Sequence, residues 1–167
     1  IRYLSSRGIG EKEIWRFGLG TARTGYFRRR IIIPSFDFDG DLNYFVGRAI
    51  DPEVRRKYVN ASTKKSEIIF NEISINWKRE LVIVEGPFDL MKSIDNSTCL
   101  LGSSISTESY LFKKIASNRT PVILALDSDM RKKINKIAKL LNSFDCSVRV
   151  VYLDDDRDIG SMTKIEA

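Results

Sequence analysis

Three apolar runs in the second half of the chain are each followed directly by acidic residues. The runs span residues 81–84, 122–126 and 148–153. Apolar, β-branched runs of this length are typical of buried strands. Helical patterns separate them, which predicts parallel strands whose carboxyl ends share one edge of a sheet. Because open α/β sheets bind ligands at that edge, we expect the acidic residues to meet there.

The remaining pattern predicts a smaller α+β lobe ahead of this sheet. Short helices are expected over 1–7 and 11–17, and strands over 28–36 and 42–49 join through an Asp-Gly turn. Residues 51–66 are polar and predicted to be irregular, and 68–77 have no clear period. In the second half, helices are expected over 87–94, 129–142 and from Ser106 or Thr107 to 116, with a short strand over 98–101. We therefore predict two domains, 1–77 and 78–167.

Composition narrows the chemistry. The chain contains no histidine and two cysteines, which excludes Ser-His-Asp and Cys-His nucleophile systems and an internal zinc site of the usual kind. We expect Cys99 and Cys146 to be buried free thiols. No stretch is long enough to span a membrane and no charged-then-apolar leader is present, so we expect no membrane partner and a cytoplasmic location.

The charge is positive and uneven. The formal net charge is +6; residues 1–75 hold fourteen Lys/Arg and nine Asp/Glu, and residues 76–167 hold fourteen and thirteen. A basic first half beside a carboxylate-bearing second half suits a polyanionic partner, although charge alone favours the simpler explanation, ordinary surface lysine and arginine. The segment 55–60, with Arg48, Lys64 and Lys65, mixes cations with an aromatic ring and an amide, which suits phosphates plus a base or sugar. A solvated loop is the alternative.

The acidic residues after the three strands are candidate metal ligands. Glu85 follows the first strand, and Asp89 lies one turn into the next helix, where it could equally be a helix-capping acid. Asp127 and Asp129 follow the second strand and would point to the same side, a spacing that suits Mg²⁺, while Asp129 could also cap a helix. Residues 154–158 supply a third acidic cluster. The acids at 37, 39 and 41 resemble a calcium loop but fit hairpin turn chemistry better.

Four blocks of residues resemble, in order and spacing, the motifs of the Toprim fold shared by bacterial-type primases, topoisomerases, some nucleases and recombination proteins. The blocks are Glu85-Gly86-Pro87-Phe88-Asp89, Gly102-Ser103-Ser104-Ile105-Ser106, Asp127-Ser128-Asp129 and Asp158-Ile159-Gly160. Segments 3–9, 17–20, 30–34, 47–50 and 57–60 look like the basic N-terminal lobe of the primase RNA polymerase domain. The resemblance implies an α/β fold: a Toprim-like parallel sheet preceded by a smaller basic α+β lobe.

The resemblance also implies an activity, template-directed synthesis of RNA primers on single-stranded DNA. By analogy, Glu85, Asp127 and Asp129 would be catalytic, and Glu85, Asp89, Asp127, Asp129 and Asp158 would hold Mg²⁺ or Mn²⁺. Arg30, Arg48, Lys57, Tyr58, Asn60, Lys64 and Lys65 would bind nucleotide or nucleic acid. The implied partners are single-stranded DNA template, ribonucleoside triphosphates, the RNA primer and a replicative helicase contacted through parts outside this chain.

Two departures from the family pattern leave alternatives open. The acid that often follows two residues after the position of Asp158 is Gly160 here, so one of Asp154, Asp155 and Asp156 could substitute for it. The family's zinc-binding module and helical C-terminal part are absent from this sequence. A Toprim nuclease with the same carboxylates, a non-catalytic nucleic-acid-binding module and, less well supported, a tyrosine topoisomerase are the alternative functions.

Overall fold

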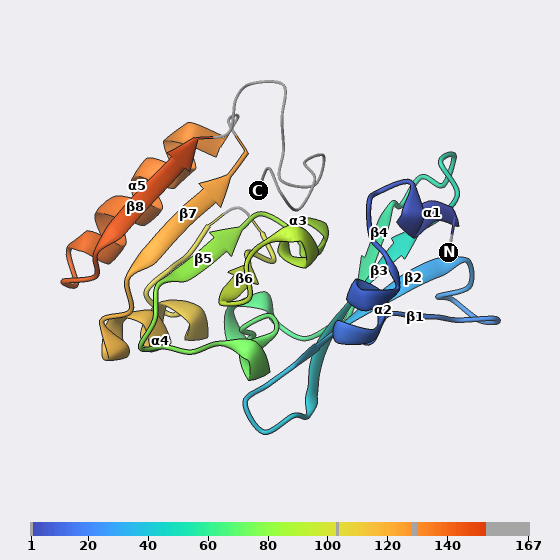
Figure 1. Cartoon of the computed structure of the whole chain (residues 1–167), viewed down its shortest axis with the longest axis horizontal. Helices are drawn as coiled ribbons and strands as arrows, with labels where there is room; N and C mark the ends of the chain where they lie inside the picture. Colours follow the sequence, from blue (N-terminus) through green and yellow to red (C-terminus); the bar gives the residue numbers. More distant parts are fainter. Residues whose placement is uncertain (1, 103, 128–129, 153–167) are drawn as a thin grey trace.

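The computed structural model describes residues 2–102, 104–127 and 130–152, which form two sheets with short helices around them (Figure 1). The first sheet is antiparallel and the second is parallel. This confirms the predicted fold class, a parallel α/β sheet preceded by a smaller α+β lobe. No helix in the described ranges combines the length and apolar character needed to cross a membrane.

The antiparallel sheet has the strand order β1-β2-β3-β4. Its strands are β1 (Gly20–Thr21), β2 (Arg30–Phe36), β3 (Leu42–Ala49) and β4 (Tyr58–Asn60), preceded by helices α1 (Arg2–Ser5) and α2 (Glu11–Arg16). β2 and β3 form the predicted hairpin around Asp39-Gly40. Asp37 builds its turn: the amide N–H groups of Asp39 and Asp41 donate to Asp37 Oδ1 at 3.1 and 2.9 Å. Hairpin chemistry therefore explains Asp37, whereas Asp39 and Asp41 take part in these bonds through their backbone alone.

The parallel sheet has the order β6-β5-β7-β8. Its strands are β5 (Leu81–Val84), β6 (Ser97–Cys99), β7 (Val122–Leu126) and β8 (Val148–Tyr152). The helices α3 (Pro87–Lys92), α4 (Tyr110–Asn118) and α5 (Arg131–Asn142) connect them. Two short 3₁₀ turns, η1 (Lys65–Glu67) and η2 (Glu72–Ser74), lead from the first sheet into the second.

Both faces of β5 are covered, which explains why its sequence is apolar without alternation. Leu81 and Ile83 pack in one core cluster with α4 and α5. Val82 and Val84 pack in a second cluster with α3 and with residues of the first sheet. This second cluster therefore crosses the predicted boundary at 77/78, which lies between η2 and β5. The division into two domains stays a prediction.

Two local predictions are wrong. Residues 58–60 form strand β4, although the segment 51–66 was expected to be irregular; their backbone pairs with β3 over only three residues, too few for a periodic signal. Helix α4 is capped by Ser109, not by Ser106 or Thr107: Ser109 Oγ accepts the Phe112 amide N–H at 3.3 Å. Both cysteines are buried and free, as predicted, and Cys99 is the last residue of β6.

Candidate metal and nucleic-acid site

The parallel sheet changes direction between β5 and β7. The chain runs from β5 to β6 on one side and then crosses to β7 on the other, so the carboxyl ends of β5 and β7 flank a topological switch point, where such sheets bind ligands. Glu85 directly follows β5 and Asp127 directly follows β7, while β8 ends beside β7 with Tyr152 paired to Leu126. The structure thus brings two of the predicted carboxylate positions to one edge.

The loop after β5 is held by its own helix start. Asp89 Oδ2 accepts the Gly86 amide N–H at 2.9 Å, and Pro87 occupies the first helical position, where its missing N–H costs nothing. Since glycine has no side chain, this is only half of a capping box. Asp89 therefore has a structural role in α3, which does not prevent its other oxygen from binding a cation.

The predicted metal ligands are only partly within the described residues. Glu85, Asp89 and Asp127 are described and half-buried, whereas Asp129 and Asp158 lie outside the described residues. Within the described ranges, no three Asp, Glu or Cys side chains gather closely enough to hold a metal ion. The chemistry of the donors, carboxylate oxygens alone, fits a hard divalent cation such as Mg²⁺ or Mn²⁺.

Arg48 lies at the centre of the predicted nucleic-acid residues. Its Nε donates to Tyr3 Oη at 2.9 Å, and its Cζ lies 4.5 Å from the centroid of the Tyr58 ring. Arg48 and Tyr58 are cross-strand partners on β3 and β4, so the pairing register itself brings them together. The guanidinium is thereby held by the hydroxyl of Tyr3 and the ring of Tyr58, which is 46% exposed.

Arg30 is the one predicted nucleic-acid residue that the structure buries. Its guanidinium donates to the backbone carbonyl oxygens of Arg56, Lys57 and Gly47, at 3.0, 3.3 and 3.4 Å. These bonds tie the 56–57 segment to the sheet, immediately before β4. In this structure Arg30 supports the segment that carries the exposed Lys57 side chain.

The other predicted residues spread along the segment that follows. Lys64 and Lys65 are exposed beside η1, and Lys64 forms an ion pair with Glu67 at 3.5 Å. Asn60 is half-buried, and its Oδ1 has no hydrogen-bond partner among the residues that the structure describes. Lys65 also lines a cavity of about 240 Å³ at the carboxyl end of β6, together with Cys99, Gly102 and several serines. A cation of the first lobe therefore borders the carboxyl edge of the parallel sheet.

Tyr3 and Arg7 are additional residues of the site that residue-by-residue reasoning did not single out. The Arg7 guanidinium lies 5.3 Å from the Tyr3 ring centroid and 4.9 Å from that of Phe88 on α3. Arg7 thus connects the first helix to the loop that carries Glu85. The four-residue spacing from Tyr3 to Arg7 on a helical turn is a signal that was available.

Comparisons with known proteins give consistent matches to primases. The chain is 26% identical over 208 residues to a DNA primase of Clostridium acetobutylicum, covering 94% of this chain and 34% of the relative. It is 33% identical over 156 residues to a DNA primase of Mycoplasma pneumoniae, covering 84% of this chain and 25% of the relative. No family model matches. The chain thus spans about a third or less of these two relatives.

Solved structures with a similar fold also include a primase. The structure of the zinc-binding and RNA polymerase domains of the Aquifex aeolicus primase aligns with a TM-score of 0.83 and 24% identity, covering 99% of this chain and 53% of that chain. The fold and the site define a protein with a Toprim-like sheet and a basic lobe. More particularly, the chain resembles bacterial DNA primases in sequence and has the fold of their catalytic cores, as its motifs predicted.

Proposed function

We propose that this chain is the catalytic part of a DNA primase, which joins ribonucleotides into short RNA primers on a single-stranded DNA template. The observation that carries the proposal is the switch point of the parallel sheet, with Glu85 and Asp127 at adjacent strand ends. The sequence likeness to DNA primases supports this reaction over nuclease activity. The proposed partners are single-stranded DNA, ribonucleoside triphosphates, the RNA primer and a replicative helicase, in the cytoplasm.

The carboxylates would hold the divalent cations. Glu85, Asp89 and Asp127, with Asp129 and Asp158, are the proposed ligands of Mg²⁺ or Mn²⁺. When bound, such ions neutralise phosphate charge and favour attack of a primer 3′-hydroxyl on the α-phosphate of a nucleotide, with pyrophosphate leaving. Asp89, held by the Gly86 amide at 2.9 Å, would keep the loop that carries Glu85 in one position.

The basic lobe would bind and orient the nucleic acid. Arg48 is held by Tyr3 and Tyr58 in one conformation, so a phosphate would meet a guanidinium that loses little freedom on binding. The exposed Tyr58 ring offers a stacking surface for a base. Lys57, Lys64 and Lys65 would add a salt-sensitive, sequence-independent attraction to the backbone.

The test compares two asparagine variants at opposite edges of the same sheet. Asp127→Asn removes a carboxylate at the carboxyl edge. The control, Asp145→Asn, removes an exposed carboxylate just before β8, at the amino edge. Asparagine tolerates the backbone φ of 58° at position 145. Each protein is incubated with single-stranded DNA, labelled ribonucleotides and Mg²⁺ or Mn²⁺. We expect RNA products from the unmodified protein and Asp145→Asn, and a loss of at least about a hundredfold in Asp127→Asn.

Three results would contradict the proposal. Equal products from both variants would remove the carboxyl edge from the reaction. Cutting of the template without nucleotides, abolished by Asp127→Asn, would favour the nuclease. DNA binding without any product, unchanged by Asp127→Asn, would favour the non-catalytic binding module.

A further inference from the structure

The tip of the β2–β3 hairpin exposes large apolar side chains at a place that the proposed function does not use. Phe38 and Leu42, on either side of the turn, are 69% and 60% exposed, and Ile73 of η2 is 51% exposed. A Cβ placed on Gly40 would lie 3.7 Å from Cδ1 of Ile73, so the hairpin tip and η2 are in contact. We refer to Phe38, Leu42 and Ile73, with the acids of the turn, as the tip surface.

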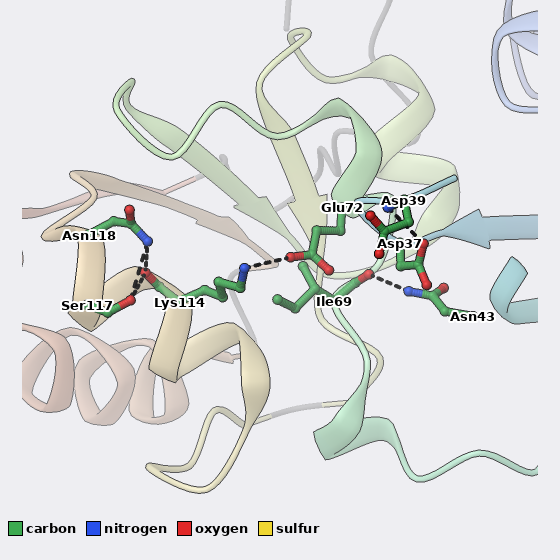
Figure 2. Close-up of polar contacts among 8 residues, drawn as sticks. All are labelled: Asp37, Asp39, Asn43, Ile69, Glu72, Lys114, Ser117 and Asn118. Carbon is green, nitrogen blue, oxygen red and sulfur yellow. Dashed lines mark hydrogen bonds and ion pairs between the residues drawn. The ribbon is translucent and has the colours of Figure 1, made fainter. Parts of the chain in front are cut away.

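The tip surface is fixed in place by polar contacts below it (Figure 2). Asp37 Oδ1 accepts the amide N–H of Asp39. It also accepts the amide N–H of Asp41 and so closes the turn. Asn43 Nδ2 donates to the carbonyl oxygen of Ile69 at 3.3 Å, and the Asn71 amide donates to Ser35 Oγ at 2.9 Å. The hairpin is therefore anchored to the chain that leads into η2. A partner would meet a preorganised surface and would lose little binding free energy in ordering it.

A hollow on the other side of η2 extends the tip surface. It has a volume of about 410 Å³ and is lined by Ile69, Glu72, Tyr110, Lys113, Lys114 and Ser117. Tyr110 is 51% exposed at its rim. Glu72, the neighbour of Ile73 in η2, lines this hollow, so η2 borders both the apolar turn and an open cavity large enough for one bulky side chain.

The charges of the tip surface are opposite to those of the molecule. Asp37, Asp39 and Asp41 cluster in five residues of a chain whose formal net charge is +6. None of the three forms an ion pair with a residue that the structure describes. The nearby cations are already paired: Lys114 with Glu72 at 3.5 Å, and Lys113 with Glu108 at 3.7 Å. The tip surface therefore repels phosphates and attracts lysine and arginine side chains.

The tip surface lies at the far end of the hairpin from the proposed nucleic-acid residues. Leu42 begins β3 and Arg48 comes six residues later, a separation of roughly 20 Å along an extended strand. We propose that the tip surface is a docking site for a segment of another protein, one with a bulky apolar residue flanked by lysines or arginines. Exposed apolar side chains with a charged rim are the usual composition of such sites. A partner bound there would leave Arg48 and Tyr58 accessible.

The proposal is tested by selecting from a random library of fifteen-residue peptides on the immobilised full chain. We expect the enriched peptides to contain an aromatic or branched apolar residue next to Lys or Arg. The Kd of a labelled enriched peptide is then measured by fluorescence anisotropy. Phe38→Ser with Ile73→Ser should weaken binding at least tenfold, and Asp39→Lys with Asp41→Lys should do the same.

Matched variants separate a local effect from a general one. Ile94→Ser removes an isoleucine that is 53% exposed elsewhere, and Glu53→Lys reverses an exposed acid of another loop; both should leave the Kd unchanged. When glutamates replace the lysines and arginines of the peptide, the variant that carries Asp39→Lys with Asp41→Lys should bind this acidic peptide more tightly than it binds the original one. Single-stranded DNA binding by each variant serves as a check of folding and does not depend on the tip surface.

Any of four outcomes would overturn the proposal. The first is that no peptide is enriched, and the second is that the enriched peptides are acidic. The third is that the control variants weaken binding as much as the tip variants, and the fourth is that the charge swap fails to restore binding. Sedimentation measures the oligomeric state of the chain. If the unmodified chain is a dimer and Phe38→Ser with Ile73→Ser makes it a monomer, a second copy of this chain occupies the tip surface and the proposed partner is wrong.

Discussion

Arg48 owes its position to groups from two parts of the chain. Tyr3 accepts from its Nε and Tyr58 faces its guanidinium, and neither contact can be made by a lysine in the same way, because an ammonium lacks the planar fork. Arg48→Lys should therefore raise the KM for ribonucleotides roughly tenfold, about the loss of one charged hydrogen bond, while the protein stays folded. The measurement is the nucleotide dependence of primer synthesis.

The control for this substitution is Arg16→Lys. Arg16 forms an ion pair with Asp95 at 2.9 Å on another surface, and its replacement should leave the KM unchanged. Equal effects of the two substitutions would mean that total charge, and not the fixed guanidinium, determines nucleotide binding.

The two buried thiols give a pH dependence. Burial raises the pKa of Cys99 well above its ordinary value, with the Asp89 charge adding to the rise, and burial also raises the pKa of Cys146. Because the folded pKa values exceed the unfolded ones, this contribution to stability is complete below about pH 8.5 and is lost as the pH rises further. Urea unfolding should show a falling free energy of unfolding above that pH, and Cys99→Val should reduce the fall.

Thiol labelling checks the same assignment independently. A disulfide reagent such as DTNB should react with neither cysteine of the folded chain on the time scale on which it labels the chain in urea, since both thiols are buried. Rapid labelling of one thiol in the folded chain would contradict the buried, neutral state.

At the residue scale, the sequence best predicted the location of a side chain when that residue directly follows a recognisable strand. Glu85 and Asp127 could be predicted because an acid directly after a fully apolar strand has a known place in a parallel sheet. The contact of Arg7 with Phe88 could not, because it joins segments about eighty residues apart in sequence, whereas the contact of Arg7 with Tyr3 is local. For Arg30, the family resemblance implied nucleic-acid contact, whereas the structure shows three bonds to backbone carbonyl oxygens.

At the scale of elements, Gly47 determines how closely β3 and β4 approach. A Cβ at this position would lie 2.8 Å from the carbonyl oxygen of Val59, closer than a side chain tolerates. Gly47→Ala should therefore lower the free energy of unfolding by about 1–3 kcal/mol, the usual cost of overpacking. It should also displace β4, which carries Tyr58, so nucleotide binding should weaken with stability.

Gly20 provides the matched control in the same sheet. A Cβ at Gly20 would meet nothing within 4 Å, so Gly20→Ala should change the free energy of unfolding by less than about 0.5 kcal/mol. Urea unfolding of both variants is the measurement. If they were equally stable, β4 would not be tightly packed on β3, and the Arg48–Tyr58 contact would need another explanation.

β5 and β7 were predictable as elements because each is covered on both faces and reads as one apolar run. Their order was not predictable, because the chain can place β7 on either side of β5 without changing any local pattern. The switch point beside Glu85 and Asp127 is therefore a result of the structure. β4 was missed for the opposite reason: its three residues are defined by pairing with β3 and not by their own sequence.

At the scale of the whole molecule, the two sheets share one hydrophobic core. Val82 and Val84 of β5 and Phe88, Leu90 and Met91 of α3 pack in the same cluster as residues of the first sheet. A chain restricted to residues 78–167 would expose much of this apolar surface, at a cost on the order of 10 kcal/mol, comparable to the whole stability of a typical domain. The second lobe is therefore expected to depend on the first.

This dependence can be measured on the 78–167 fragment beside the full chain. The opposite face of the parallel sheet packs against α4 and α5, which the fragment keeps, although the fragment loses Ile69, Ile75 and Trp77 from that cluster. Helical and strand content should therefore persist. Fixed side-chain packing should be lost. We therefore expect the fragment to bind ANS, to show weak near-UV circular dichroism and to unfold in a broad transition, whereas the full chain unfolds sharply. A fragment with a sharp transition and no ANS binding would instead establish 78–167 as an independent domain, and the shared cluster would be an interface between two stable units.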